Sequence, residues 1–138
     1  MKKLIALALC VVTLFCLFVP VYASGISLYT NNVSSADTVF SISSTGKAVV
    51  TSDYLGKDGL VTKGTIHTKI QKKFGLIWIT VDCGEWTDTS TATSYSVSHT
   101  LQLLKSGTYR AHVEFTIYGT GGSPDNMTTN IERTYTKP

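Results

Sequence analysis

The chain has 138 residues, and its 12 basic and 9 acidic residues give a formal net charge of +3. That length suits one domain with a two-layer core and is too short for two ordinary domains. A charge so close to neutral excludes the strong basic surplus expected of a nucleic-acid-binding protein.

The first 23 residues have the three parts of a secretory signal peptide. Met1-Lys2-Lys3 is positive, Leu4–Val19 is almost wholly apolar, and Val21-Tyr22-Ala23 resembles a cleavage site. An uncleaved membrane anchor is the alternative, but the apolar run is slightly shorter than the ~18–20 residues of a spanning helix. We therefore predict cleavage after Ala23 and a secreted, extracellular protein of residues 24–138 with no stable membrane span. Loss of the two leader lysines lowers its net charge to +1.

Only one cysteine, Cys83, follows the expected cleavage point. It cannot form an internal disulfide, so packing alone must hold the domain together. A secreted domain without disulfides, behind a compact Lys-Lys leader, indicates a bacterial exporter. Cys83 continues the face set by Ile79 and Val81 on an expected strand. This pattern favours a buried, inert thiol over a nucleophile or an intermolecular bridge.

The sequence after residue 24 shows no helical spacing of apolar residues and is rich in Thr, Ser, Val, Ile and Tyr, which is typical of strands. The clearest strand is Tyr109–Tyr118, in which apolar and polar residues alternate and predict one buried and one solvated face. The expected strands, in chain order, are a stub at Ile26–Thr30 and then Thr38–Ser43, Lys47–Asp53, Gly64–Lys73, Leu76–Cys83, Thr93–Leu101, Tyr109–Tyr118 and Thr128–Thr136.

Short turn sequences separate these strands, and no crossover helix is available between them. Seven antiparallel strands at this spacing predict a sandwich or a small barrel. The tight turn between Lys73 and Leu76 should make its two strands neighbours in one sheet. The Ser/Thr-rich stretch Thr87–Thr93 is expected to be a solvated connection.

Two sets of residues carry a resemblance to known proteins. The run from Leu104 to Tyr109, followed by alternating apolar residues, resembles the tyrosine corner of immunoglobulin-like and fibronectin type III sandwiches. Taken whole, the chain is similar to a family of small uncharacterised proteins exported by Gram-positive bacteria. The shared segments are Gly46–Val50, the Ile70–Trp78 hairpin and Gly107–Arg110, and the resemblance covers most of residues 38 to 136. It implies an all-β, antiparallel immunoglobulin-like (fibronectin type III-like) β-sandwich of about seven strands and carries no established activity.

The residues suited to catalysis or metal binding are few. His67, His99 and His112 lie on three different expected strands without close metal-ligand spacing. If the expected strands Gly64–Lys73 and Tyr109–Tyr118, the third and sixth after the stub, pair with each other, His67, His112 and Glu114 share one exposed face. Scattered solvent histidines are favoured there over a surface metal site. A hydrolase would need Asp82, Glu85 and a histidine in one pocket, whereas acids beside a turn usually keep an edge soluble. No nucleophile elbow or phosphate-binding loop is present.

These observations predict a secreted, non-enzymatic module without a cofactor or metal, associated with an extracellular protein or a cell-wall polymer. The expected binding face is the outer face of the strands Gly64–Lys73, Leu76–Cys83 and Tyr109–Tyr118. Its candidate residues are His67, Lys69, Arg110, His112 and Glu114, with Trp86 at the rim. The alternative function is a small secreted toxin or bacteriocin-like effector.

Overall fold

The structure, a computed structural model, describes residues 30–138, all of whose regular elements are strands. The expected leader, its cleavage point and the stub up to residue 29 lie outside the described residues. The strands are β1 Val33–Ile42, β2 Lys47–Gly56, β3 Val61–Phe74, β4 Ile77–Ser90, β5 Ser94–Gln102, β6 Gly107–Gly119 and β7 Asp125–Tyr135.

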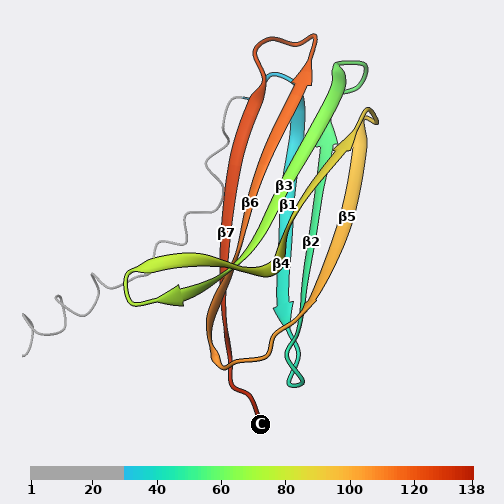
Figure 1. The fold of residues 1–138 in the computed structure, drawn as a ribbon. Helices are drawn as coiled ribbons and strands as arrows, with labels where there is room; N and C mark the ends of the chain where they lie inside the picture. The colour runs from blue at the N-terminus through green and yellow to red at the C-terminus, as the bar shows by residue number, and fades with distance from the viewer. Residues whose placement is uncertain (1–29) are drawn as a thin grey trace, which may run out of the picture.

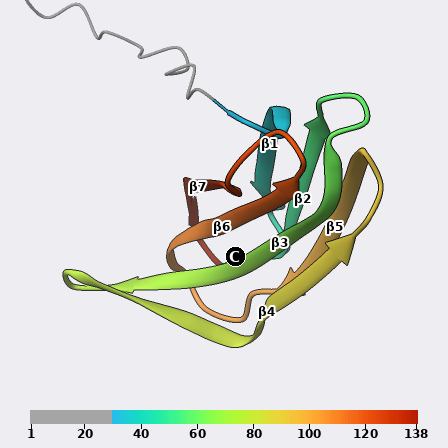
Figure 2. The ribbon, with the colours of Figure 1, turned by 90° about the horizontal axis from the view of Figure 1, so that it is seen from above.

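The seven strands form two antiparallel sheets (Figures 1 and 2), one in the order β1-β2-β5 and the other in the order β4-β3-β6-β7. The first, second and fifth strands thus face the other four, which is the arrangement of a fibronectin type III-like member of the immunoglobulin-like sandwiches. The predicted fold class is confirmed. The pairing of β3 with β6 also brings the expected third and sixth strands together.

The core lies between the two sheets and follows the alternation of the sequence. Along β6, the five side chains predicted to face inward are all at most 2% exposed: Tyr109, Ala111, Val113, Phe115 and Ile117. They pack with buried side chains of the opposite sheet, including Phe40 and Val50. A Cβ on Gly64 would lie only 2.4 Å from the buried ring of Tyr54, so the two sheets approach closely at this point because position 64 has no side chain.

Two polar contacts fix the ends of the sandwich. The Tyr109 hydroxyl donates a hydrogen bond of 2.6 Å to the carbonyl of Lys105, which confirms the predicted tyrosine corner. At the other end, the buried carboxylate of Asp125 accepts hydrogen bonds from three successive backbone N–H groups, those of Asn31, Asn32 and Val33, at 2.7, 2.6 and 3.0 Å. Asp125 thereby ties the entrance of β1 to the start of β7.

Strand β4 is longer than the sequence predicts. It continues to Ser90, so the first four residues of the expected solvated connection Thr87–Thr93 belong to the strand. Their ladder with β3 joins Gly64–Lys69 to Glu85–Ser90 and uses main-chain hydrogen bonds, which polar side chains tolerate well on an edge strand. The expectation that this stretch is wholly a connection was wrong.

A wide bulge interrupts β4. Thr80 pairs with Gln71 and Glu85 pairs with Lys69, so the four residues from Val81 to Gly84 lie opposite Ile70 alone. Inside this bulge Cys83 is exposed and has a φ of 59°. The expectation of a buried thiol was wrong, because the bulge breaks the two-residue period that Ile79 and Val81 had set.

Candidate functional site

The outer face of sheet β4-β3-β6-β7 carries a polar cluster. The β3–β6 register places His67 opposite Glu114 and Lys69 opposite His112. Directly opposed residues in a ladder project on the same side of the sheet. Arg110 lies on the same face opposite Gln71, and its Nε donates a hydrogen bond of 2.7 Å to the Gln71 side chain. The structure thus brings five of the predicted candidates onto one face: His67, Lys69, Arg110, His112 and Glu114. We call His67, Lys69, Glu85, Arg110, His112 and Glu114 the outer-face cluster.

His67 is the centre of this cluster. Its Nε2 lies 2.8 Å from a carboxylate oxygen of Glu85, and its Nδ1 lies 3.3 Å from a carboxylate oxygen of Glu114. Lys69 Nζ adds a contact of 3.7 Å to Glu85. The hydrogen bond from His67, with smaller contributions from the two positive charges, holds the pKa of the Glu85 carboxyl below its ordinary value of 4.5.

Trp86 does not join the outer-face cluster. It pairs with the buried Thr68, so its side chain projects to the inner side of β4. There its ring stacks on His99 with centroids 4.6 Å apart and an interplanar angle of 6°. His99 Nε2 lies 2.6 Å from a carboxylate oxygen of Asp88. Trp86, His99 and Asp88 together cover the edge between β4 and β5. Their contacts with one another explain why they are partly buried, without a ligand.

The two acids of the hydrolase hypothesis lie in different surroundings. Glu85 contacts His67 in the outer-face cluster, whereas Asp82 lies in the β4 bulge and lines a separate groove. Within residues 30–138, no group of three or more His, Cys, Asp or Glu side chains is arranged to hold a metal ion.

A second surface lies where β3 and β4 leave the sandwich. Both ribbon views show the β3–β4 hairpin extending sideways beyond the two sheets (Figures 1 and 2). Its ladder pairs Gln71 with Thr80 and ends in a two-residue turn at Gly75 and Leu76. Gly75 has a φ of 59°, and glycine at the first turn position is the requirement of a type II′ hairpin turn. We call residues 71–80 the projecting hairpin.

The projecting hairpin exposes four large apolar side chains. The exposed fractions are 97% for Leu76, 60% for Ile77, 50% for Phe74 and 47% for Ile79. Phe74 continues the side of β3 that is buried at Ile70, and Ile77 pairs with Phe74. The side of this sheet that faces the core thus continues along the hairpin, where no second sheet covers it.

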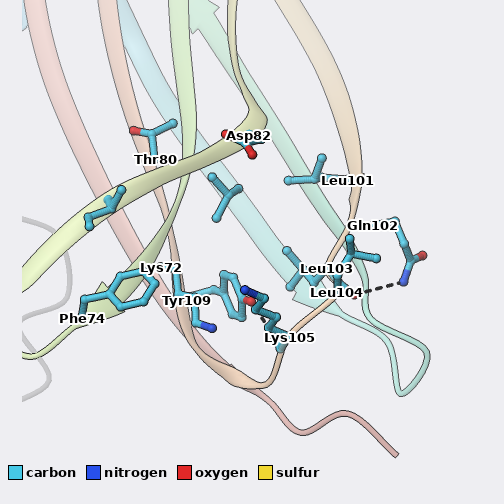
Figure 3. A pocket seen from close by; sticks show the side chains of 12 residues that line it. Lys72, Phe74, Thr80, Asp82, Leu101, Gln102, Leu103, Leu104, Lys105 and Tyr109 are labelled. Carbon is cyan, nitrogen blue, oxygen red and sulfur yellow. Dashed lines mark hydrogen bonds between the residues drawn. The ribbon is translucent and has the colours of Figure 1, made fainter.

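A groove of about 330 Å³ separates this apolar face from the connection between β5 and β6. Figure 3 shows Lys72 and Phe74 on one side of it, Leu101, Leu103 and Leu104 on the other, and Tyr109 between them. Leu104 is 72% exposed and extends the apolar surface beyond the hairpin. Large exposed apolar surfaces on soluble proteins are typical of contact sites.

The hairpin also carries positive charge. Lys72 Nζ lies 5.3 Å from the ring centroid of Phe74 on the groove side. On the opposite side, the Trp78 ring lies 5.6 Å from Lys73 Nζ and 4.5 Å from Arg110 Cζ. Residues 71–80 contain no carboxylate. The sequence predicted the tight turn between Lys73 and Leu76, and the pairing of Phe74 with Ile77 confirms it. It did not predict that the apolar side chains of this segment are exposed, although a cluster of apolar residues around a tight turn was a signal for exposure.

Comparison with protein-family models, curated proteins and solved structures found no significant match for the chain. In the part of the chain that the structure describes, no helix has the length and apolarity to span a membrane. The fold and the two surfaces are therefore the basis for assigning a function.

Proposed function

We propose that the protein is a secreted, non-enzymatic immunoglobulin-like module that binds an extracellular partner or associates with a cell surface. The observation that carries this proposal is the exposure of four large apolar side chains on the projecting hairpin. Monomeric soluble proteins rarely keep such a contiguous apolar surface unless it contacts another molecule. The outer-face cluster supplies a second, polar contact surface on the same sheet.

The fold supports a contact role for these surfaces. A sandwich holds its strands rigidly. The two strands of the hairpin stay paired from Gln71 and Thr80 up to Phe74 and Ile77, so the hairpin is an ordered extension of the sheet. Contact residues on an ordered element lose little conformational entropy on binding. The outer-face cluster is likewise preorganised by contacts of 2.8 and 3.3 Å around His67.

A cell-binding assay tests the proposal. Fluorescently labelled protein is incubated with bacterial cells, walled and with the wall removed, and the bound fraction is measured. Leu76→Ser should lower binding by about tenfold, since it removes the contribution of a leucine side chain that becomes buried when the partner binds. Val39→Ser is the matched control, because Val39 is a 61%-exposed apolar residue on β1, away from the hairpin.

A paired variant, His112→Ala with Glu114→Ala, tests the outer-face cluster separately. Absence of binding by the wild-type protein to cells and to extracellular proteins contradicts the proposed function. Growth inhibition of neighbouring strains by the same preparation favours the alternative, a small secreted toxin or bacteriocin-like effector.

A further inference from the structure

We infer that the partner of the projecting hairpin is an anionic lipid bilayer. In this arrangement Phe74, Leu76 and Ile77 enter the apolar boundary of the bilayer while the lysines face headgroup phosphates. The inference rests on the proposed function and names the partner of one of its surfaces.

The shape of the hairpin favours a bilayer over a protein pocket. Its most exposed apolar residue, Leu76, stands in the turn itself and is 97% exposed, with Ile77 next to it at 60%. Such a convex apolar tip can enter a deformable lipid phase without a preformed cavity. Peripheral proteins bind bilayers by burying apolar side chains into the boundary between headgroups and acyl chains.

The charges on the hairpin favour an anionic surface. Lys72 lies on the groove side and Lys73 on the opposite side, each beside an aromatic ring. A bilayer surrounds an inserted tip on all sides, so both lysines can meet phosphates at once. Carboxylates flank the segment at Asp82, in the groove, and at Glu132, opposite Arg110 in the β6–β7 register, but the segment itself has none.

Trp78 has the position expected of an interfacial anchor. Its ring lies between Lys73 and Arg110, set back from the turn by one residue more than Ile77. Tryptophan is enriched at the level of the headgroups, where its ring is partly apolar and its N–H remains hydrogen-bonded. Trp78 pairs with Lys73, one step behind the Phe74–Ile77 pair, so the tryptophan and this lysine lie at one level behind the apolar tip. That arrangement matches a bilayer, in which the headgroup layer lies outside the acyl chains.

Two other occupants fit less well. A second copy docked tip to tip would bring Lys72 and Lys73 close to their own counterparts, and like charges repel. An anionic polymer would satisfy the lysines but would leave Leu76 and Ile77 in water. An anionic bilayer, which is charged at its surface and apolar beneath it, satisfies both sets of side chains.

Vesicle flotation tests the inference. Purified protein, with an identical N-terminus confirmed by intact mass in every variant, is mixed with vesicles of phosphatidylcholine alone or with added phosphatidylglycerol. We expect stronger binding to the phosphatidylglycerol vesicles that weakens at high salt. Lys73→Gln should weaken this binding by about fivefold, and Leu76→Ser by about tenfold. Lys47→Gln and Val39→Ser, at exposed positions elsewhere on the sandwich, should bind as the wild type does.

Tryptophan fluorescence locates the contact. In a Trp86→Phe background, the emission of Trp78 should shift to the blue on addition of phosphatidylglycerol vesicles and remain unchanged on addition of polyphosphate. Equal binding to both kinds of vesicle, or equal binding by Leu76→Ser and wild type, overturns the inference. A hairpin-dependent dimer without lipid binding also overturns it and identifies a second copy as the occupant.

The failure of this inference differs from the failure of the proposed function. If the hairpin variants lose cell binding while the wild type binds no vesicle, the binding module stands and its partner is another surface component. If the wild type binds neither cells nor vesicles, both proposals fail.

Discussion

Asp125 offers the sharpest test of how the sandwich is closed at its N-terminal end. Its carboxylate is 7% exposed and accepts hydrogen bonds from the N–H groups of Asn31, Asn32 and Val33. Two of these bonds end on one carboxylate oxygen and the third ends on the other. Asp125→Ala removes every acceptor at once and leaves three donors at the entrance of β1 without a partner.

The size of the effect follows from the bond type. A hydrogen bond to a charged group contributes about 1.5–3 kcal/mol, and the three bonds share one acceptor group, so their losses do not add in full. We expect Asp125→Ala to lower the free energy of unfolding by about 3–5 kcal/mol, comparable to the loss of one partner of a buried ion pair. Asp125→Asn keeps one oxygen and should lose about half as much.

Urea denaturation at constant pH measures these differences, with tryptophan fluorescence as the probe. Asp58→Ala is the matched control, since Asp58 is an exposed carboxylate in the β2–β3 connection, and its effect should stay within about 0.5 kcal/mol. A loss of less than about 1 kcal/mol in Asp125→Ala would refute the assigned role of this carboxylate.

Three further predictions concern single positions. Gly64→Ala should lower the free energy of unfolding by about 1–3 kcal/mol in urea denaturation, because its Cβ would lie 2.4 Å from the Tyr54 ring; an unchanged midpoint would contradict the close approach. Cys83→Gly should raise that free energy by about 0.5–1 kcal/mol and Cys83→Val should lower it, because the φ of 59° disfavours a Cβ, most of all a branched one; equal stabilities would argue against this backbone geometry. His67→Ala should raise the pKa of Glu85 towards 4.5 in a carboxyl NMR titration. Since folding lowers that pKa, the stabilisation from this contact is present above pH 4.5 and is lost as the pH falls through the lowered value. If His67→Ala left the pKa of Glu85 unchanged, the hydrogen bond from His67 would be excluded as the cause of the lowered pKa.

Much of the fold was predictable from the sequence because a strand has a strict two-residue period. Alternation from Tyr109 to Ile117 identified the buried face of β6 without any tertiary information. The tyrosine corner was predictable because its residues are neighbours in the chain, and Tyr109 bonds to Lys105 only four residues away. Pairing of the third and sixth strands then followed from the fold class and placed His67 opposite Glu114.

Other features depended on where the period is interrupted. The bulge from Val81 to Gly84 turns Cys83 to solvent, and the register on its far side turns Trp86 towards the inner edge, where it stacks on His99. A bulge adds residues to one strand without a distinctive local signal, so the faces of the residues beyond it cannot be counted from the residues before it.

The sequence by itself determined which side chains share a face within an uninterrupted strand, where the tight turns lie and that the strands belong to an antiparallel sandwich. Only the tertiary structure decided that the apolar face at Phe74 and Ile77 has no second sheet opposite it. The physical reason is that periodicity specifies the side of a strand on which a residue projects, whereas burial depends on what the rest of the chain places against that side.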